Sequence, residues 1–246
     1  MVATALPYNR ALHGDDYRQL DPYVATLREF ERKLQGVNYR KDHQHREWEY
    51  AQALQQLADL FPRRVPASIS VLDTGSGASY FPLLLKVQGY DVTVNDSMAY
   101  GDTTEWLRAQ CFHLDKVTGR EIRIPLVVAP LERLGLPDNT FDVTMCISVI
   151  EHLPTTEFAN GLRELWRVTT PGGYLFLTSD YFKNWDHAKT SPSLGIQHNL
   201  FYPHTAERMI NNVIDVEWVG GVDLTYHEPG LINGHSFVTF CLRKPR

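Results

Sequence analysis

The sequence predicts an α/β fold with a mostly parallel sheet and helices on both of its faces. Three observations lead to this prediction. Between residues 67 and 180, short apolar runs alternate with helical patterns, as parallel strands joined by helices do. One apolar run, at 71–72, enters a turn with two glycines that opens a helix. Finally, 43% of the 246 residues are hydrophobic, which is enough to bury one full core.

The first 66 residues are predicted to form a helical extension that covers the rest of the chain. Asp21-Pro22 has the chemistry of a helix start, and this helix is expected to run to about Gln35. A second helix is expected from His45 to Leu60, because apolar side chains recur there every three or four positions. The proline-containing run at 61–66 then leads into the first strand.

The remaining elements are expected within a second domain at 67–246. Pro125 lies inside an apolar run and cannot donate a hydrogen bond, which favours an edge strand at 122–128. Residues 181–204 form a long polar connection, predicted to be a lid-like insertion. The other expected elements are a helix at Phe81–Val87, a strand at Phe141–Val149, a helix at Glu157–Thr169, a strand at Tyr174–Thr178 and a terminal strand pair at Val216–Leu224 and Ser236–Leu242.

The glycine turn predicts a site for a nucleotide-like cofactor. Gly75 and Gly77 lack a Cβ, so a ligand can approach the backbone closely. The turn departs from the dinucleotide pattern, because Tyr80 replaces the third glycine and Asp73 precedes the first. An acid at this position suits a cationic or amino-bearing ligand better than a pyrophosphate. Asp96 ends the next expected strand, where it can accept hydrogen bonds from ribose hydroxyls.

Four sequence blocks share the order and spacing of one known family. They are VLDTGSGAS at 71–79, VTVNDS at 92–97, LPDNTFDVTMCISVIEHLP at 136–154 and LWRVTTPGGYLFLTSD at 165–180. In these blocks the chain resembles the class I S-adenosylmethionine-dependent methyltransferases. The resemblance covers most of residues 67–180. It implies a Rossmann-like sheet of seven strands, in which the terminal pair supplies an antiparallel strand.

The resemblance implies S-adenosyl-L-methionine as cofactor, with S-adenosyl-L-homocysteine as product. Asp73 is expected to face the methionine amino group, directly or through water, and Asp96 to accept both ribose hydroxyls. The structural alternatives are a strand-end cap for Asp73 and a turn residue for Asp96. The complete set of expected cofactor-binding residues is Asp73, Gly75, Ser76, Gly77, Asp96, Ser97, Met98, Leu131, Glu132, Ile147 and Ser148.

One position departs from the pattern of the family. Many relatives carry an acid that meets the adenine amino group just before the third block, and Pro130 occupies the equivalent position here. Proline offers neither an acid nor an N–H group. Adenine recognition is therefore expected to involve the Leu131 backbone and apolar packing, with Glu132 as the alternative side-chain partner.

Glu151 and His152 are the expected catalytic residues. They follow the central strand, and the carboxyl ends of strands border the ligand crevice in open α/β sheets. A histidine also has a pKa suited to proton transfer near neutral pH. The alternative is that this pair caps a helix or closes over the cofactor.

A dense cluster near the N-terminus predicts a cover over the acceptor. Its residues Tyr39, His45, Arg46 and Trp48, together with Tyr181, His187 and His198 from the later connection, are expected to line the cofactor cover or the acceptor pocket. The alternative is a solvated helix face. Within the cluster, His43 and Glu47 are spaced as one metal-binding pair without a matching second pair, so the sequence predicts no metal site.

Composition narrows the class of partner and the compartment. A net charge of -5 offers no basic face for nucleic acid, and no apolar stretch approaches the length of a membrane span. Cys111, Cys146 and Cys241 are expected to be small buried hydrophobes, since their number and spacing indicate neither disulfides nor zinc. The expected protein is cytoplasmic, and its oligomeric state is left open.

The expected function is methyl transfer from S-adenosylmethionine to an oxygen or nitrogen nucleophile of a small molecule. Two alternatives remain. One is a non-catalytic, methyltransferase-like module that binds the cofactor without turnover. The other is a nicotinamide-dependent oxidoreductase, which Asp73 and Tyr80 disfavour because a pyrophosphate does not suit this turn.

Overall fold

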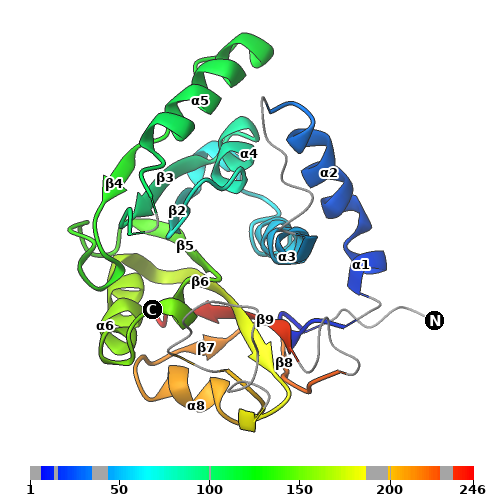
Figure 1. Cartoon of the computed structure of the whole chain (residues 1–246), viewed down its shortest axis with the longest axis vertical. Coiled ribbons are helices and arrows are strands. Elements are labelled where there is room, and N and C mark those ends of the chain that lie inside the picture. The colour runs from blue at the N-terminus through cyan, green and yellow to red at the C-terminus, as the bar shows by residue number, and fades with distance from the viewer. Residues whose placement is uncertain are drawn as a thin grey trace.

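The computed structural model describes residues 7–13, 16–34, 44–99, 101–186, 199, 201–227 and 235–246. Within this part of the chain, nine strands form one sheet (Figure 1). Its order is β4 (Leu126–Val128), β3 (Asp91–Asp96), β2 (Ser70–Thr74), β5 (Phe141–Ile147), β6 (Thr169–Phe182), β9 (His235–Arg243), β1 (Asn9–Ala11) and β8 (Val222–Asp223), while β7 (Glu217–Trp218) also pairs with β9. The strands from β4 to β6 run parallel, and β9 is antiparallel to β6.

Helices cover both faces of the sheet, so the predicted α/β class is confirmed. The α-helices are α1 (Asp16–Gln19), α2 (Asp21–Glu31), α3 (Gln44–Leu60), α4 (Phe81–Val87), α5 (Thr104–Thr118), α6 (Thr155–Val168) and α8 (Ala206–Asn211), and the 3-10 helices are η2 (Pro66–Ser68), η3 (Leu131–Arg133) and η4 (Ile150–His152). Helices α2 to α5 lie on one side of the sheet, and α6 and α8 on the other (Figure 1).

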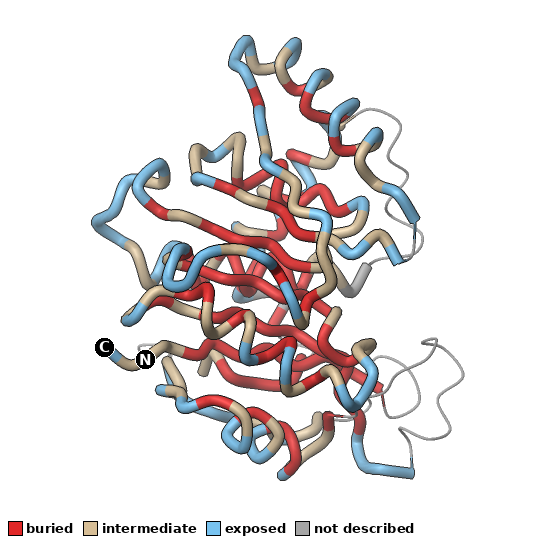
Figure 2. The backbone as a smooth tube through the Cα atoms, turned by 90° about the vertical axis from the view of Figure 1, so that its left-hand side faces the viewer, coloured by how far each residue is buried: buried red, intermediate tan, exposed pale blue. Residues whose placement is uncertain are grey.

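Each face of the sheet has its own apolar core. Phe176 of β6 packs into the cluster with α3 and α4, whereas its neighbours Leu175 and Leu177 pack into the cluster with α6 and α8. This alternation follows from the two-residue period of a strand. Because both faces are covered, the central strands are buried along most of their length (Figure 2). The sheet is therefore a rigid platform for the residues that follow its strand ends.

The sheet has nine strands where seven were expected, and the difference lies at the edge beyond β9. The segment Asn9–Ala11 forms a strand in a region expected to be helical. The Asn9 side chain explains its position: the amide donates to the carbonyls of Val219 (2.7 Å) and Gly221 (2.8 Å), and Oδ1 accepts from the Cys241 N–H (2.7 Å). One buried amide thereby joins β1 to the strands around it.

Most other elements follow the expected ones, but the strand expected at Val216–Leu224 is instead two short strands, β7 and β8, which pair with β9 and β1 respectively. Helix α4 has the expected bounds, α3 begins one residue early, and β4 lies at the sheet edge but begins only after Pro125. Strand β6 is longer than expected, because it continues through the Pro171-Gly172-Gly173 segment that was interpreted as a turn. The three cysteines are buried and free, as expected.

Candidate functional site

The glycine turn after β2 is fastened to the next strand. The N–H groups of Gly75 and Ser76 both donate to the Asn95 carbonyl, at 2.8 and 3.3 Å. Both glycines have positive φ, +64° at Gly75 and +53° at Gly77, which disfavours any residue with a Cβ. A Cβ on Gly75 would lie 2.5 Å from a methyl group of Val149, whereas one on Gly77 would have nothing within 4 Å. Gly75 thus faces packed protein, and the Cβ side of Gly77 is open.

Asp96 clamps this turn from the end of β3. Its Oδ2 accepts the N–H of Gly77 and its Oδ1 accepts the N–H of Met98, both at 2.7 Å. A carboxylate oxygen has two lone pairs, so each oxygen keeps the capacity to accept one more donor. Met98 has a positive φ of 59° and is half-buried, while the neighbouring Ser97 is exposed.

Asp73 lies beneath the turn, near the end of β2, and only 4% of it is exposed. Burial raises its pKa to about 7, with a further contribution from Asp96, while a hydrogen bond from Ser76 acts in the opposite direction. A buried carboxyl group of this kind is poorly stabilised as an anion. A cationic ligand beside it would favour the charged form.

The segment expected to meet adenine follows β4. Asn95 donates its amide to the carbonyls of Val127 and Ala129, at 3.0 and 2.9 Å, and the Ala129 N–H donates to the Asp96 carbonyl. Pro130 is extended and precedes η3. In η3, Leu131 is buried and Glu132 is half-buried. These bonds hold the start of η3 beside the end of β3.

Helix α3 is attached to the ends of β5 and β6 by a buried carboxylate. Glu49 accepts hydrogen bonds from the hydroxyls of Ser148 and Thr178 and pairs with Arg46 at 3.0 Å. Ser148 follows β5 with a positive φ of 48°, and Thr178 belongs to β6. Trp48, also on α3, is fully buried and donates to Asp16 of α1 at 3.0 Å. The N-terminal helices are therefore fixed over the carboxyl end of the sheet.

Acidic and histidine side chains meet beside this contact. Glu151 of η4 is fully buried, and its Oε1 accepts the Asp180 N–H at 3.2 Å. Asp180 Oδ1 in turn pairs with His235 Nε2 at 3.0 Å. Burial raises the pKa of Glu151 well above its usual value, and the charge of Asp180 adds to the effect. His152, next in sequence, is half-buried.

The predicted cofactor residues gather mainly at the carboxyl ends of the central strands, whereas the described cover residues lie on two elements, with Arg46 and Trp48 on α3 and Tyr181 on β6. Tyr181 lies in β6, where its hydroxyl donates to the Leu224 carbonyl at 2.6 Å. Ile147 is buried at the end of β5. Tyr39, His187 and His198 lie outside the described residues, and of His45 only its position in α3 is described.

Sequence reasoning missed three polar residues of this region. Asp180 carried the same signal as Asp73 and Asp96, because it is an acid near the carboxyl end of a strand. Glu49 and His235 carried no comparable signal. A carboxylate on an amphipathic helix usually faces water, and His235 approaches Asp180 only in the folded sheet.

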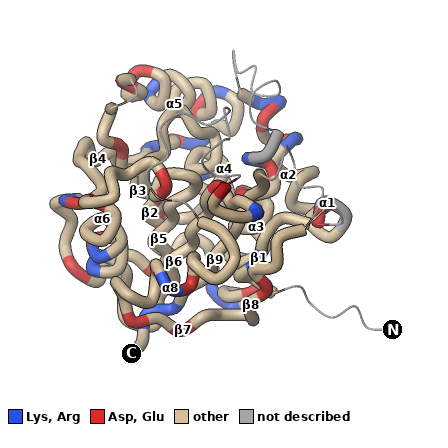
Figure 3. The backbone as a smooth tube through the Cα atoms, turned by 60° about the horizontal axis from the view of Figure 1, so that its bottom comes forward, with Lys and Arg blue, Asp and Glu red and all other residues tan. Residues whose placement is uncertain are grey.

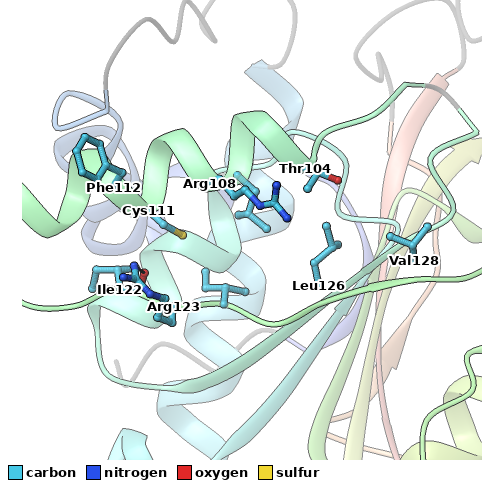
Figure 4. A pocket seen from close by; sticks show the side chains of 10 residues that line it. Thr104, Arg108, Cys111, Phe112, Ile122, Arg123, Leu126 and Val128 are labelled. Carbon is cyan, nitrogen blue, oxygen red and sulfur yellow. Dashed lines mark hydrogen bonds between the residues drawn. The ribbon is translucent and has the colours of Figure 1, made fainter.

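A separate pocket of about 570 Å³ lies between α5 and β4. Arg108, Phe112, Arg123 and Val128 are among its lining residues (Figure 4). It contains none of the predicted site residues. Acidic and basic residues are interspersed over the described part of the molecule (Figure 3). No helix in that part is both long and apolar enough to cross a membrane.

Comparisons with known proteins identify the central region. A family model described as a methyltransferase domain matches residues 72–177. A demethylmenaquinone methyltransferase of Deinococcus radiodurans is 30% identical over 132 residues, which is 54% of this chain and 48% of that protein. The chain thus matches about half the length of this relative.

Two solved structures share the fold over most of the chain. A 1,6-didemethyltoxoflavin N1-methyltransferase of Burkholderia thailandensis has a TM-score of 0.55 at 18% identity, covering 92% of this chain and 90% of its own. The N-methyltransferase NodS of Bradyrhizobium japonicum has a TM-score of 0.57 at 15% identity, covering 94% and 100%. At these identities the likeness extends to the fold alone.

Proposed function

We propose that the chain transfers a methyl group from S-adenosylmethionine to a small molecule, in keeping with the methyltransferase-domain model that matches residues 72–177. The observation that carries this proposal is the clamp of Asp96 across the glycine turn. It leaves carboxylate lone pairs beside the open side of Gly77, where a ribose with two hydroxyls can bind.

Three further features support the same cofactor. Asp73 is a buried carboxyl group whose charged form an ammonium group would stabilise. The methionine amino group of the cofactor would supply such a group. Ser97 and Met98 follow Asp96 and are proposed to lie beside ribose and adenine. Leu131 and Glu132 are proposed to border adenine, because backbone hydrogen bonds hold the start of η3 beside Asp96.

The acceptor is proposed to bind under α3, beyond the ends of β5 and β6. Gln52 lies on the same face of α3 as Glu49 and is fully buried. Among the described residues, its amide nitrogen and oxygen have no hydrogen-bond partner. Buried polar groups without partners are uncommon in folded proteins and favour a polar ligand. An acceptor with an oxygen or nitrogen nucleophile and neighbouring hydrogen-bonding groups fits this polar face of α3 better than a hydrocarbon.

Methyl transfer requires mainly alignment and exclusion of water, because the sulfonium already activates the methyl carbon. Bound S-adenosylmethionine would supply a methyl carbon open to the acceptor's lone pair, with a thioether as the leaving group. Helix α3, fixed by Glu49, supplies a cover over the site. His152 stays the predicted proton acceptor. Glu151 is fully buried and accepts the Asp180 N–H, so it contacts Asp180 rather than solvent.

Calorimetric titration with S-adenosylhomocysteine tests the cofactor site. Asp96→Ala should weaken binding by about 2–4 kcal/mol, roughly 30- to 900-fold, because it removes charge-assisted hydrogen bonds to both ribose hydroxyls. The matched control is Asp91→Ala, at the other, exposed end of β3. It should bind as wild type does, and circular dichroism should show both variants folded.

Wild-type affinity in Asp96→Ala would remove the ribose assignment. Tighter binding of NAD than of S-adenosylmethionine by the wild type would favour the oxidoreductase alternative. Formation of S-adenosylhomocysteine in a panel of phenols, carboxylic acids and amines then separates an enzyme from a module that binds without turnover.

A further inference from the structure

Three side chains with metal-binding atoms meet at the carboxyl ends of β5 and β6. Glu151 and His152 come from η4, directly after β5, and Asp180 comes from the neighbouring strand β6. One ligand atom of each residue lies within 4.8 Å of those of the other two. Each ligand atom of a metal ion lies about 2.0–2.3 Å from it, so two such atoms lie no farther apart than twice that distance. The spacing of the three atoms in this cluster is therefore compatible with a shared ion.

Buried acidic side chains are concentrated around this cluster. Glu49, Glu151 and Asp180 are buried carboxyl groups, and Arg46 is the guanidinium that pairs with Glu49. Buried charges require compensation by a partner or a metal ion. A cation held between these carboxyl groups would provide such compensation.

Two hydrogen-bonding details point to a cation between these groups. Glu151 Oε2 is fully buried and has no hydrogen-bond partner in the part of the chain that the structure describes, although Oε1 of the same carboxyl group accepts the Asp180 N–H. Asp180 is oriented from its other side by His235, whose Nε2 lies 3.0 Å from Oδ1. Metal-binding carboxylates typically receive such a hydrogen bond from a neighbouring residue, which fixes their direction.

We propose that Glu151, His152 and Asp180 bind a divalent metal ion, and that His235 orients Asp180 for this role. One imidazole nitrogen and two carboxylate oxygens suit manganese, iron(II) or zinc better than calcium, which prefers oxygen ligands throughout. The half-buried His152 gives the ion a path from solvent. The sequence predicted no metal site, because Asp180 lies 29 residues from Glu151 along the chain.

The place of this ion has a chemical consequence for the reaction. It would lie at the sheet edge beneath α3, on the acceptor side of the proposed cofactor site. A metal ion there can bind the acceptor oxygen or nitrogen and lower its pKa. The role as ligand competes with the predicted role of His152 as proton acceptor, because a nitrogen bound to the metal cannot also take a proton.

Titration of the full chain with Mn²⁺ alone tests the proposal without any acceptor. Manganese binding is followed by electron paramagnetic resonance and calorimetry, and Co²⁺ is added in parallel because its visible absorption reports nitrogen and oxygen ligands. We expect one saturable site per chain. Asp180→Asn and His152→Ala should each weaken binding at least tenfold, and His235→Gln should weaken it by about 10- to 100-fold.

The controls are Glu121→Gln, an exposed acid before β4, and His113→Asn on α5, which make the same types of substitution away from the cluster. Both should bind Mn²⁺ as wild type does. The absence of saturable binding by the wild type would overturn the proposal, as would equal affinity in wild type, Asp180→Asn and His152→Ala. His152 is half-buried, so its variant keeps the test decisive if a substitution at a fully buried position prevents folding.

Discussion

The two glycines of the turn after β2 differ in what surrounds them, and this difference predicts unequal costs for the same substitution. Gly75 and Gly77 both have positive φ. An alanine in this region costs about 1–2 kcal/mol in the folded state. At Gly75 the added Cβ would also lie 2.5 and 2.6 Å from the two methyl groups of Val149.

The contact with Val149 sets the difference between the variants. Inserting a methyl group into packed protein costs about 1–3 kcal/mol. Gly75→Ala should therefore lower the free energy of unfolding by about 2–5 kcal/mol, and Gly77→Ala by about 1–2 kcal/mol. Gly77→Ala should instead weaken S-adenosylhomocysteine, because the new methyl group points to the open side of the turn.

Urea unfolding of both variants measures these values, and calorimetry measures the ligand. Val149→Ala completes the test, because it removes the methyl groups that the new Cβ meets. Combined with Gly75→Ala, it should recover about 1–3 kcal/mol relative to the sum of the single substitutions. Equal unfolding midpoints for Gly75→Ala and Gly77→Ala, or simple additivity with Val149→Ala, would refute this account.

Two further predictions concern buried carboxyl groups. Glu49→Ala should lower the free energy of unfolding by about 3–5 kcal/mol, because Ser148, Thr178 and Arg46 lose a common buried partner. Glu47→Ala, two residues earlier on α3, removes an ion pair with a half-exposed Arg28 and should cost at most about 1 kcal/mol. Urea unfolding compares the two, and similar losses would contradict the anchoring role of Glu49. The second prediction concerns Asp73, whose pKa is raised to about 7 in the folded state and lies near 3.9 in an unfolded chain. Between about pH 4 and 7 the folded state keeps a proton that the unfolded state has released, so the free energy of unfolding should fall as the pH rises through this window. The Asp73→Asn variant should lack this decrease in the free energy of unfolding. The same dependence on pH in the variant and the wild type would contradict the raised pKa of Asp73.

The sequence predicted those parts of the fold whose signals are local. The bounds of α4 and the start of β2 followed from apolar runs next to glycines, and the position of β4 at the sheet edge followed from Pro125. The strand Asn9–Ala11 escaped prediction, because three residues that include an asparagine and an arginine carry no apolar alternation. Its position depends on the Asn9 side chain and on partners near the far end of the chain.

The candidate site likewise has one part that the sequence could predict and one part that it could not. Asp73, Gly75, Gly77 and Asp96 stand in two short blocks, so their proximity could be predicted from strand order. The group around Asp180 could not, because its members come from separate elements and meet only after the sheet and α3 have packed. Burial of a carboxylate is also set by tertiary structure, and a helical pattern alone does not distinguish the buried Glu49 from the half-buried Glu47.

The hydrogen bond from Cys241 to Asn9 joins residues 232 positions apart, and this has a consequence for biosynthesis. The first strand leaves the ribosome long before the strand that receives it has been translated. Until then, the outer edge of β6 has no neighbour, and unpaired strand edges promote association between chains. Completion of the sheet must therefore wait until β9 has been translated. A nascent chain arrested before residue 235 would therefore leave this edge of β6 open to pairing with another chain.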